Sequence, residues 1–222
     1  MTVTPRYLDY RQARRVYDRI GRWQDTRPLT ERRAMDEIAW RGDFYNTAAL
    51  LEFGCGTGRF AARLLETKLP AGAAYLGLDV SPTMVELARE ALAPWGARAR
   101  VELSDGSTRL PAGDGEFDRF VCTYVVDLLS PADAEGLLGE AHRVLRPGGL
   151  LALASLAPGS TPPSRVLTGL WRGLWRIDPR AVGGCRPVEL GALLAPGHWR
   201  VRDRLTVTKW ALSSEVLVAE RL

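Results

Sequence analysis

Between residues 48 and 155, short apolar runs alternate with segments of helical character. The predicted strands are Ala48–Phe53, Ala74–Asp79, Ala99–Leu103, Phe117–Val125 and Leu150–Ser155, and the predicted helices are Arg59–Lys68, Pro82–Leu92 and Ala132–Leu145. Strands that alternate with helices of about 10 to 15 residues are typical of βαβ units. Right-handed crossovers then place helices on both faces of a doubly wound, mostly parallel sheet, so the chain is predicted to be an α/β protein.

The regions on either side follow other patterns. Residues 1–46 are helical and amphipathic, with breaks at Gly21 and Pro28, and predict a helical N-terminal cap. After Pro158, an insert over residues 156–200 contains a Pro/Gly/Ser segment and a Trp-rich helix. Strand-like runs at Val201–Lys209 and Glu215–Leu222 predict a C-terminal antiparallel hairpin over residues 201–222. We therefore expect a single domain over residues 1–222, with its core at residues 47–155.

The composition argues against several classes of protein. No apolar run approaches the roughly 18 to 20 residues that cross a bilayer, and the first residues lack the apolar core of a secretion signal. The net charge of +4 is spread too evenly for the concentrated basic surface of a nucleic-acid-binding protein. Cys55, Cys122 and Cys185 are far apart and odd in number, so we expect no disulfide framework, no metal site and a cytoplasmic location.

The strongest local motif is Gly54-Cys55-Gly56-Thr57-Gly58, which follows the first predicted strand and opens the first predicted helix. Glycines there let a ligand approach the backbone closely, and the helix N-terminus presents its free N–H groups to that ligand. A dinucleotide-binding loop has the spacing G-x-G-x-x-G, but its last glycine is replaced here by Arg59. With Glu52 two residues ahead of the motif, the spacing favours a smaller ligand without a pyrophosphate.

Acidic residues stand at or near the carboxyl ends of three predicted neighbouring strands. They are Glu52 on the first strand, Asp79 at the end of the second and Asp105 after the third. Open α/β sheets bind their ligands at this edge. A carboxylate at the end of the second strand can accept hydrogen bonds from two ribose hydroxyls. A carboxylate after the third strand can accept a hydrogen bond from an adenine amino group. The alternatives are a helix cap at Asp79 and an Asx turn at Asp105.

Over residues 48–155, about half of the chain, the sequence resembles the class I S-adenosylmethionine-dependent methyltransferases. The branch that it resembles most includes the ubiquinone and menaquinone biosynthesis enzymes. The matching stretches are Leu51–Phe60, Leu78–Ala88, Asp105–Leu110, Phe117–Tyr124 and Glu140–Leu150. The resemblance implies that the core binds S-adenosylmethionine and releases S-adenosylhomocysteine.

The resemblance also implies a role for individual residues toward that cofactor. It implies that the methionine part lies beside Glu52, Gly54, Cys55, Gly56, Gly58 and Thr123. It implies that Asp79 binds the ribose. The adenine is then expected to lie against Val80, Met84, Asp105 and Gly106.

Methyl transfer from a sulfonium is an in-line displacement, so the protein mainly supplies alignment and excludes water. A base is needed only where the nucleophile must lose a proton. Many similar enzymes carry a His just after the fourth strand, whereas this chain has Asp127 and Leu128 there. We expect Tyr124 and Asp127 to contact the substrate or accept its proton, with packing or capping as the alternative role.

Two flanking segments are expected to build the acceptor pocket. In the first, Tyr17 is expected near the cofactor and Trp23 near the substrate. In the second, a predicted helix over Ser164–Arg176 carries Val166, Leu167, Leu170, Trp171, Leu174 and Trp175 on one broad half, with Arg residues opposite. Three interpretations stay open: a helix packed on the sheet, a lid that brings Trp171 and Trp175 to the acceptor, and a helix on a membrane surface.

The sequence thus predicts methyl transfer from S-adenosylmethionine to a small, partly apolar acceptor, without a nucleic-acid partner. One alternative is a phospholipid or quinone-precursor methyltransferase in transient contact with a membrane surface. Another is a noncatalytic S-adenosylmethionine-binding partner subunit. A nicotinamide dehydrogenase is the most distant alternative, which Arg59 disfavours. No feature of the sequence indicates a particular oligomeric state.

Overall fold

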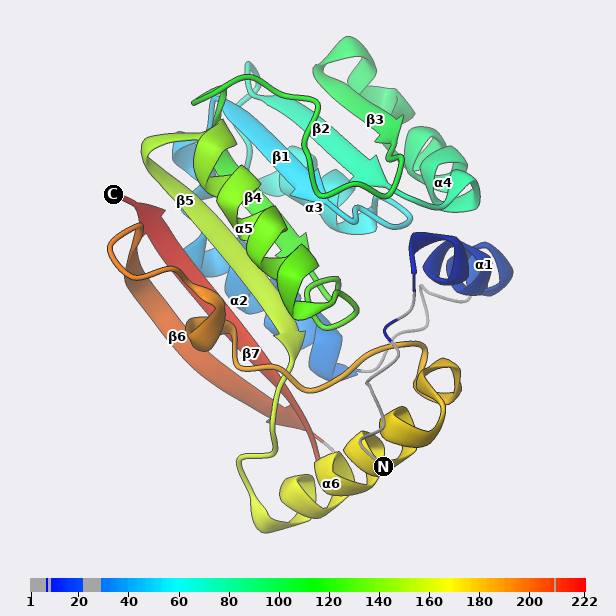
Figure 1. Cartoon of the computed structure of the whole chain (residues 1–222). Coiled ribbons are helices and arrows are strands. Elements are labelled where there is room, and N and C mark those ends of the chain that lie inside the picture. The colour runs from blue at the N-terminus through cyan, green and yellow to red at the C-terminus, as the bar shows by residue number, and fades with distance from the viewer. Residues whose placement is uncertain (1–6, 8, 22–28, 210) are drawn as a thin grey trace.

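The computed structural model describes residues 7, 9–21, 29–209 and 211–222. Within these residues, seven strands form one sheet in the order β3-β2-β1-β4-β5-β7-β6 (Figure 1). The strands are β1 (Ala49–Phe53), β2 (Ala74–Asp79), β3 (Ala99–Leu103), β4 (Phe117–Thr123), β5 (Leu145–Leu156), β6 (Trp199–Lys209) and β7 (Leu212–Arg221). Neighbours among β1 to β5 are parallel, and β7 is antiparallel to β5 and β6. The predicted parallel core and C-terminal hairpin are confirmed.

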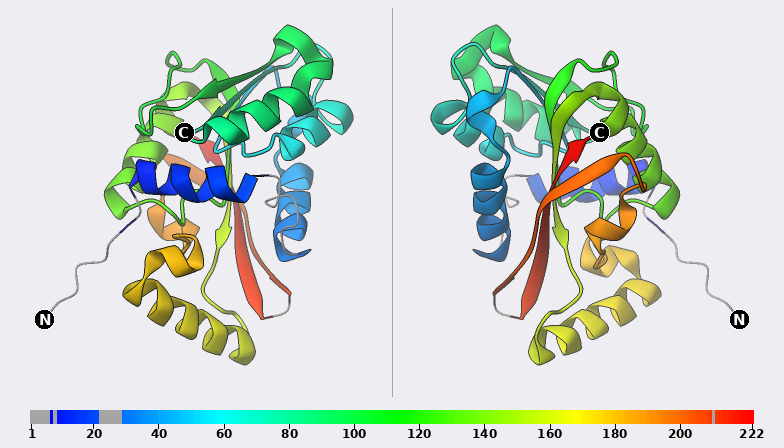
Figure 2. Two further views of the ribbon diagram at one scale, coloured as in Figure 1. Left: turned by 90° about the vertical axis from the view of Figure 1, so that its right-hand side faces the viewer. Right: turned by 90° about the vertical axis from the view of Figure 1, so that its left-hand side faces the viewer.

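Helices cover both faces of the sheet (Figures 1 and 2). Along β1, the alternation of side chains sends Leu50 to one face and Leu51 to the other. The first face is covered by α2 (Leu29–Arg41), α3 (Arg59–Thr67) and α4 (Pro82–Leu92). The second is covered by α5 (Pro131–Val144) and the short helix η5 (Leu190–Leu193). Each face therefore has its own apolar cluster, as in a doubly wound fold.

Three helices begin at a hydroxyl residue followed by proline. Ser81, Ser130 and Thr161 are the N-caps of α4, α5 and α6 (Pro162–Ile177), and each accepts a backbone N–H from the first turn through its side chain. The proline that follows each cap has the backbone angle of a helix and lacks only an N–H that the helix leaves free. These pairs fix where three of the crossover or insert helices start.

Two strand boundaries differ from the prediction for identifiable reasons. β4 ends at Thr123 rather than Val125, because Tyr124 has a φ of 57° and turns the chain out of the sheet. β5 begins at Leu145 rather than Leu150, because Leu145 already pairs with Phe117 before the irregular Pro-Gly-Gly segment. Both differences lie where turn residues interrupt an otherwise regular pattern.

Two helices lie outside the two layers. α1 (Tyr10–Ile20) lies beside α4, where Asp18 accepts a hydrogen bond from the hydroxyl of Ser81 (Figure 1). α6 lies at the periphery below the sheet and packs mainly on the short helix η4 (Pro179–Val182) and on β7. The remaining short helices are η2 (Phe44–Asn46) and η3 (Ala93–Arg98). The proposed division into cap, core, insert and hairpin stays a prediction.

Candidate active site

The glycine motif forms a tight loop between β1 and α3. Gly54, Gly56 and Gly58 all have positive φ, at 76°, 54° and 76°. The N–H groups of Gly54 and Cys55 both donate to the carbonyl of Leu78, at 2.7 and 3.0 Å, and so attach the loop to the end of β2. Around the position of a Cβ on Gly56 there is no heavy atom within 4 Å. Hydrogen bonds to the end of β2 therefore fix the loop, and the space beside Gly56 is open to a ligand.

Asp79 stands at the end of β2 and faces this loop. Its Oδ2 accepts the N–H of Gly56 at 2.9 Å, and its Oδ1 accepts the N–H of Ser81 at 2.9 Å. The carboxylate thus connects the glycine loop to the start of α4. Asp79 also lines a cavity at this edge of the sheet.

A cavity of about 290 Å³ opens at the carboxyl ends of β1, β2 and β4. It brings together seven of the predicted cofactor-binding residues from the core, which are Gly54, Gly56, Asp79, Val80, Met84, Gly106 and Thr123. Tyr17, predicted near the cofactor from the N-terminal segment, lines it from α1. Residues from distant parts of the sequence, from Tyr17 on α1 to Thr123 at the end of β4, therefore converge on one cavity.

A second cavity of about 410 Å³ lies on the other side of the glycine loop. It shares Gly54, Gly56 and Thr123 with the first cavity, and Glu52 and Cys55 line it. Most of its remaining lining is charged and comes from α2 and α3: Glu31, Arg32, Asp36, Arg59 and Arg63. The first cavity is mainly apolar and the second carries both signs of charge, so the two suit different parts of one ligand.

Glu52 is a buried carboxyl beside the second cavity. Tyr75 donates its phenolic O–H to Glu52 Oε2 at 2.7 Å. Burial raises the pKa of Glu52 to about 8, the charge of Asp79 raises it further, and the bond from Tyr75 acts in the opposite direction. Burial also raises the pKa of the Cys55 thiol, which makes Cys55 a poor nucleophile.

Tyr124 and Asp127, the predicted catalytic residues, have different surroundings. Tyr124 lines the first cavity, while its hydroxyl donates to Ser214 Oγ at 2.9 Å inside the core. Asp127 is fully buried, its Oδ2 accepts the N–H of Leu156 at 3.4 Å, and it is absent from the cavity lining. Their catalytic role stays a prediction, and the contacts of Asp127 are those of a structural residue at the end of β5.

Asp105 and Gly58 are the two predicted cofactor residues that line neither cavity. Asp105 is exposed, and its Oδ1 accepts the N–H of Ser107 at 2.8 Å in an Asx turn beside a separate recess. Gly58 is the N-cap of α3 and approaches α4, where an added Cβ would lie 3.0 Å from Ala88 Cα. Gly58 thus determines how closely two helices pack below the loop.

The predicted substrate residues lie away from the first cavity or outside the described residues. Trp171 and Trp175 donate their indole N–H groups to the carbonyls of Cys185 and Gly184, at 2.8 and 3.0 Å. Neither lines either cavity. Trp23 lies outside the residues that the structure describes.

Several residues that line the first cavity were missed by the sequence argument. On α1 these are Tyr10 and Ala13, preceded by Asp9, which accepts the N–H of Gln12 in a capping box. After β4, they are Leu128, Leu129 and Asp133. The spacing of Tyr10, Ala13 and Tyr17 on one helical face was the available signal for α1.

Tyr10 covers Gly106 closely, since an added Cβ on that glycine would lie 2.5 Å from the Tyr10 ring. α1 is therefore a wall of the first cavity and a neighbour of the loop after β3. In the part of the chain that the structure describes, no helix is long and apolar enough to span a membrane.

Comparisons with known proteins agree with this arrangement. Residues 50–149 match the family model described as a methyltransferase domain. A malonyl-[acyl-carrier protein] O-methyltransferase of Laribacter hongkongensis is 32% identical over 68% of this chain and 52% of its own length. A demethylmenaquinone methyltransferase of Thermus thermophilus is 37% identical over 64% of this chain and 61% of its own. The chain spans about half the length of the first of these relatives.

The fold has close counterparts among solved structures. The crystal structure of the [4+2]-cyclase SpnF superimposes with a TM-score of 0.74 over 97% of both chains, at 16% identity. At that identity the likeness concerns the fold alone. The matched domain and the curated relatives give the family of the core: residues 50–149 belong to the methyltransferase domain family.

Proposed function

We propose that this protein transfers a methyl group from S-adenosylmethionine to a small, partly apolar acceptor. The observation that carries the proposal is the pair of cavities that meet at Gly54, Gly56 and Thr123. An adenosylated amino acid has an aromatic, largely uncharged end and a zwitterionic end. The apolar first cavity suits the adenosine, and the charged second cavity suits the amino-acid end.

The residues of the chain fit that donor in three respects. Asp79 presents carboxylate oxygens to the first cavity and is a suitable acceptor for ribose hydroxyls. Val80 and Met84 supply apolar surface for a purine ring. At the second cavity, Arg32, Arg59 and Arg63 stand with Glu31 and Asp36, which matches the two opposite charges of an amino acid.

When bound, S-adenosylmethionine supplies an activated methyl group on a positively charged sulfur. The chain's own part is then to align the acceptor and to keep water away, with Tyr17 on α1 and Tyr124 after β4 as walls. The hydroxyl of Tyr124 is bonded to Ser214, and the cavity that Tyr124 lines is mainly apolar, which favours an acceptor with apolar surface.

A second candidate is a related methyltransferase whose acceptor is dissolved in a membrane, such as a phospholipid or a quinone precursor. The observation that favours it is a row of exposed aliphatic side chains on α6. The two candidates share the donor site and differ in where the acceptor is found.

Ligand-induced thermal stabilisation tests the donor site. S-Adenosylhomocysteine is expected to raise the Tm at micromolar concentration, whereas NAD should have no effect at millimolar concentration because Arg59 stands where a pyrophosphate loop needs Gly. The reverse ranking would overturn the proposal.

Activity is tested with labelled donor and an extract of small metabolites. Products are identified by mass spectrometry. Asp79→Ala, which lacks the carboxylate proposed to bind the ribose, serves as the control. Label transfer by the wild-type protein but not by the variant supports the proposal. Donor binding without transfer to any fraction, including a lipid extract, favours instead a noncatalytic donor-binding subunit.

A further inference from the structure

α6 presents three different faces around its axis. Ser164, Thr168 and Trp175 face the protein and are buried. A second face carries Val166, Leu170, Leu174 and Ile177, whose side chains are 66%, 68%, 45% and 84% exposed. A third carries Arg165, Arg172 and Arg176, which are exposed. The four aliphatic residues are named here the α6 stripe.

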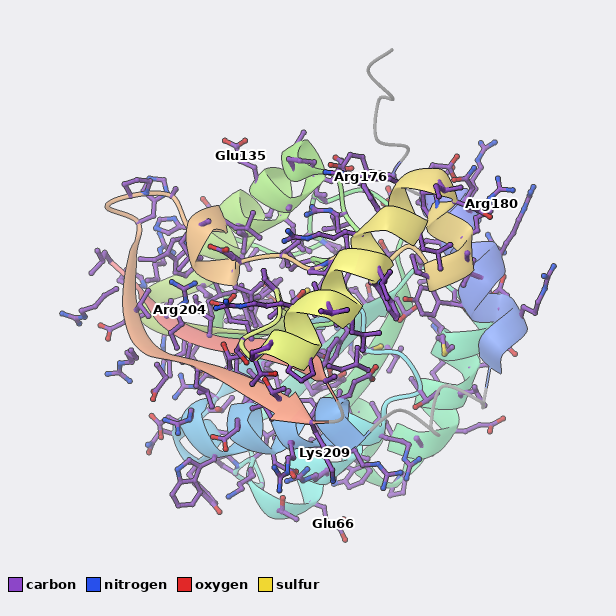
Figure 3. All side chains as sticks on the ribbon, turned by 90° about the horizontal axis from the view of Figure 1, so that it is seen from below. Glu66, Glu135, Arg176, Arg180, Arg204 and Lys209 are labelled. Carbon is purple, nitrogen blue, oxygen red and sulfur yellow. The ribbon has the colours of Figure 1, made fainter. Side chains whose placement is uncertain are left out.

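The α6 stripe is a continuous row of exposed apolar side chains. It extends over the 12 residues from Val166 to Ile177, or about 16 Å along the helix axis. Large aliphatic side chains occur singly on most protein surfaces, whereas a contiguous row indicates an interaction site. Figure 3 looks onto α6 from below and shows the helix in front of the sheet, with no other described element over it.

The charge next to the stripe selects the kind of partner. α6 contains no acidic residue, and Arg180 in η4 continues its row of cations. Within the described part of the chain, none of these four Arg side chains has an ion-pair partner. The surface beside the stripe is therefore cationic and suits a negatively charged partner. A second copy of this chain, docked stripe to stripe, would bring like charges together.

The shape of the surface favours a bilayer over a protein. Protein interfaces usually depend on aromatic anchors that enter a pocket. The two aromatic residues of α6, Trp171 and Trp175, point instead toward the protein and donate to the carbonyls of Cys185 and Gly184. What remains outside is a convex row of aliphatic side chains. Such a row can enter the soft boundary of headgroups and acyl chains without a matching groove.

We propose that α6 is a docking site for an anionic lipid surface. The α6 stripe would enter the interface parallel to the membrane plane, and Arg165, Arg172, Arg176 and Arg180 would pair with lipid headgroups. The inference does not depend on methyl transfer, because binding to lipid is measured without donor or acceptor.

The position of α6 gives this docking a consequence for the site. Trp171 and Trp175 hold residues 184 and 185, and the next residue, Arg186, donates to the carbonyl of Leu129 at 2.9 Å. Leu129 lines the first cavity. A protein docked through α6 therefore has a short connection from the lipid surface to the cavity wall.

Cosedimentation with vesicles tests the proposal. Wild-type protein is expected to bind phosphatidylcholine vesicles that contain phosphatidylserine and to bind pure phosphatidylcholine vesicles at least tenfold more weakly. Leu170→Gln with Ile177→Gln should weaken binding at least tenfold, because two apolar side chains no longer enter the interface. Arg165→Gln with Arg172→Gln should weaken it about 25-fold, at about fivefold for each charge.

Matched controls separate the α6 face from net charge and exposed apolar area in general. Arg100→Gln with Arg200→Gln removes two charges from side chains that are 66% and 63% exposed on other elements. Trp40→Gln removes an apolar side chain that is 75% exposed on α2. Both controls should bind anionic vesicles like the wild type.

Three results would overturn the proposal. The first is wild-type binding that is absent or equal for anionic and neutral vesicles. The second is an equal loss in the control variants. The third is a change of oligomeric state in the Leu170→Gln, Ile177→Gln variant, measured by light scattering, which would assign the stripe to a protein contact. Because all substituted side chains are exposed, the circular dichroism spectrum and the Tm of each variant should match those of the wild type. Binding of the wild type to anionic vesicles should also weaken as the salt concentration rises, which is a second test that needs no variant.

Discussion

Tyr75 on β2 donates its phenolic O–H to Glu52 on the neighbouring strand β1, with 2.7 Å between the two oxygens. Both side chains are buried, and burial is the main cause that raises the pKa of Glu52 to about 8. The carboxyl is therefore mostly protonated at neutral pH. An acid that lines the second cavity thus remains uncharged at neutral pH, and a cationic ligand bound there would favour its ionised form.

The first prediction concerns stability against pH. The pKa of Glu52 is about 8 in the folded state and 4.5 as an ordinary value, so the folded state binds more protons between these two pH values. The contribution of Glu52 to the free energy of unfolding is thus complete below pH 4.5 and is lost as the pH rises through about 8. Its slope is at most about 1.4 kcal/mol per pH unit.

Glu52→Gln stays neutral at all pH values and should flatten this decline, as measured by urea unfolding across the window. Glu140→Gln is the control, because hydrogen bonds from Arg143 lower the pKa of Glu140 to about 2 and leave it ionised throughout. A Glu52→Gln variant with the slope of the wild type would contradict the pKa assigned to Glu52.

The second prediction concerns Asp79. Asp79→Ala is expected to weaken S-adenosylhomocysteine binding by about 1.5 to 3 kcal/mol, or roughly 10- to 150-fold, because a charged acceptor of two hydroxyls is lost. Asp79→Asn keeps one acceptor oxygen toward Gly56 or Ser81 and should lose less. Calorimetric titration measures both, with circular dichroism as the control for folding. Unchanged affinity in Asp79→Ala would remove Asp79 from the site.

The parallel core could be predicted because each of its elements follows from local sequence. Apolar strands, Ser-Pro helix starts and the glycine motif are all short-range signals, and parallel pairing then brings the strand ends together. Gly54, Asp79 and Thr123 all lie at the carboxyl ends of parallel strands, so their convergence on one cavity could be predicted from that position alone.

The surroundings of the site could not be predicted in the same way, because they depend on contacts between distant segments. Nothing near Tyr10 in sequence indicates that its ring covers Gly106, and nothing near Tyr124 indicates a bond to Ser214. The helical pattern of α6 was predicted correctly, but a pattern of apolar residues does not say which of them face the protein. The structure buries Trp175 and leaves Leu170 exposed.

The third prediction separates two glycines of one loop. Both Gly56 and Gly58 have positive φ, so Ala at either position costs about 1 to 2 kcal/mol of backbone strain. At Gly58 the new Cβ would also lie 3.0 Å from Ala88 Cα, whereas at Gly56 it meets no heavy atom within 4 Å. Gly58→Ala should therefore lower the Tm clearly more than Gly56→Ala.

Donor binding should rank the same two variants in a different way. Gly56 lines both cavities and Gly58 lines neither, so Gly56→Ala should weaken S-adenosylhomocysteine binding beyond its effect on stability. Thermal unfolding and calorimetric titration of both variants give the comparison. Equal loss of affinity in the two would mean that the loop acts only through its overall conformation.

The last prediction decides between packing and a lid for the tryptophans of α6. Trp171→Phe with Trp175→Phe keeps an aromatic ring at each position and removes the two N–H donors to residues 184 and 185. Because Trp175 is 8% exposed and packs against Tyr7, with ring centroids 5.5 Å apart, we expect the main effect on folding, at about 1 to 3 kcal/mol for two lost hydrogen bonds. Urea unfolding measures this loss.

Donor affinity should stay within a factor of about three, since neither side chain lines the cavities. If the double variant instead keeps its stability while the acceptor KM rises at least tenfold, the indoles reach the acceptor during turnover and the lid interpretation holds.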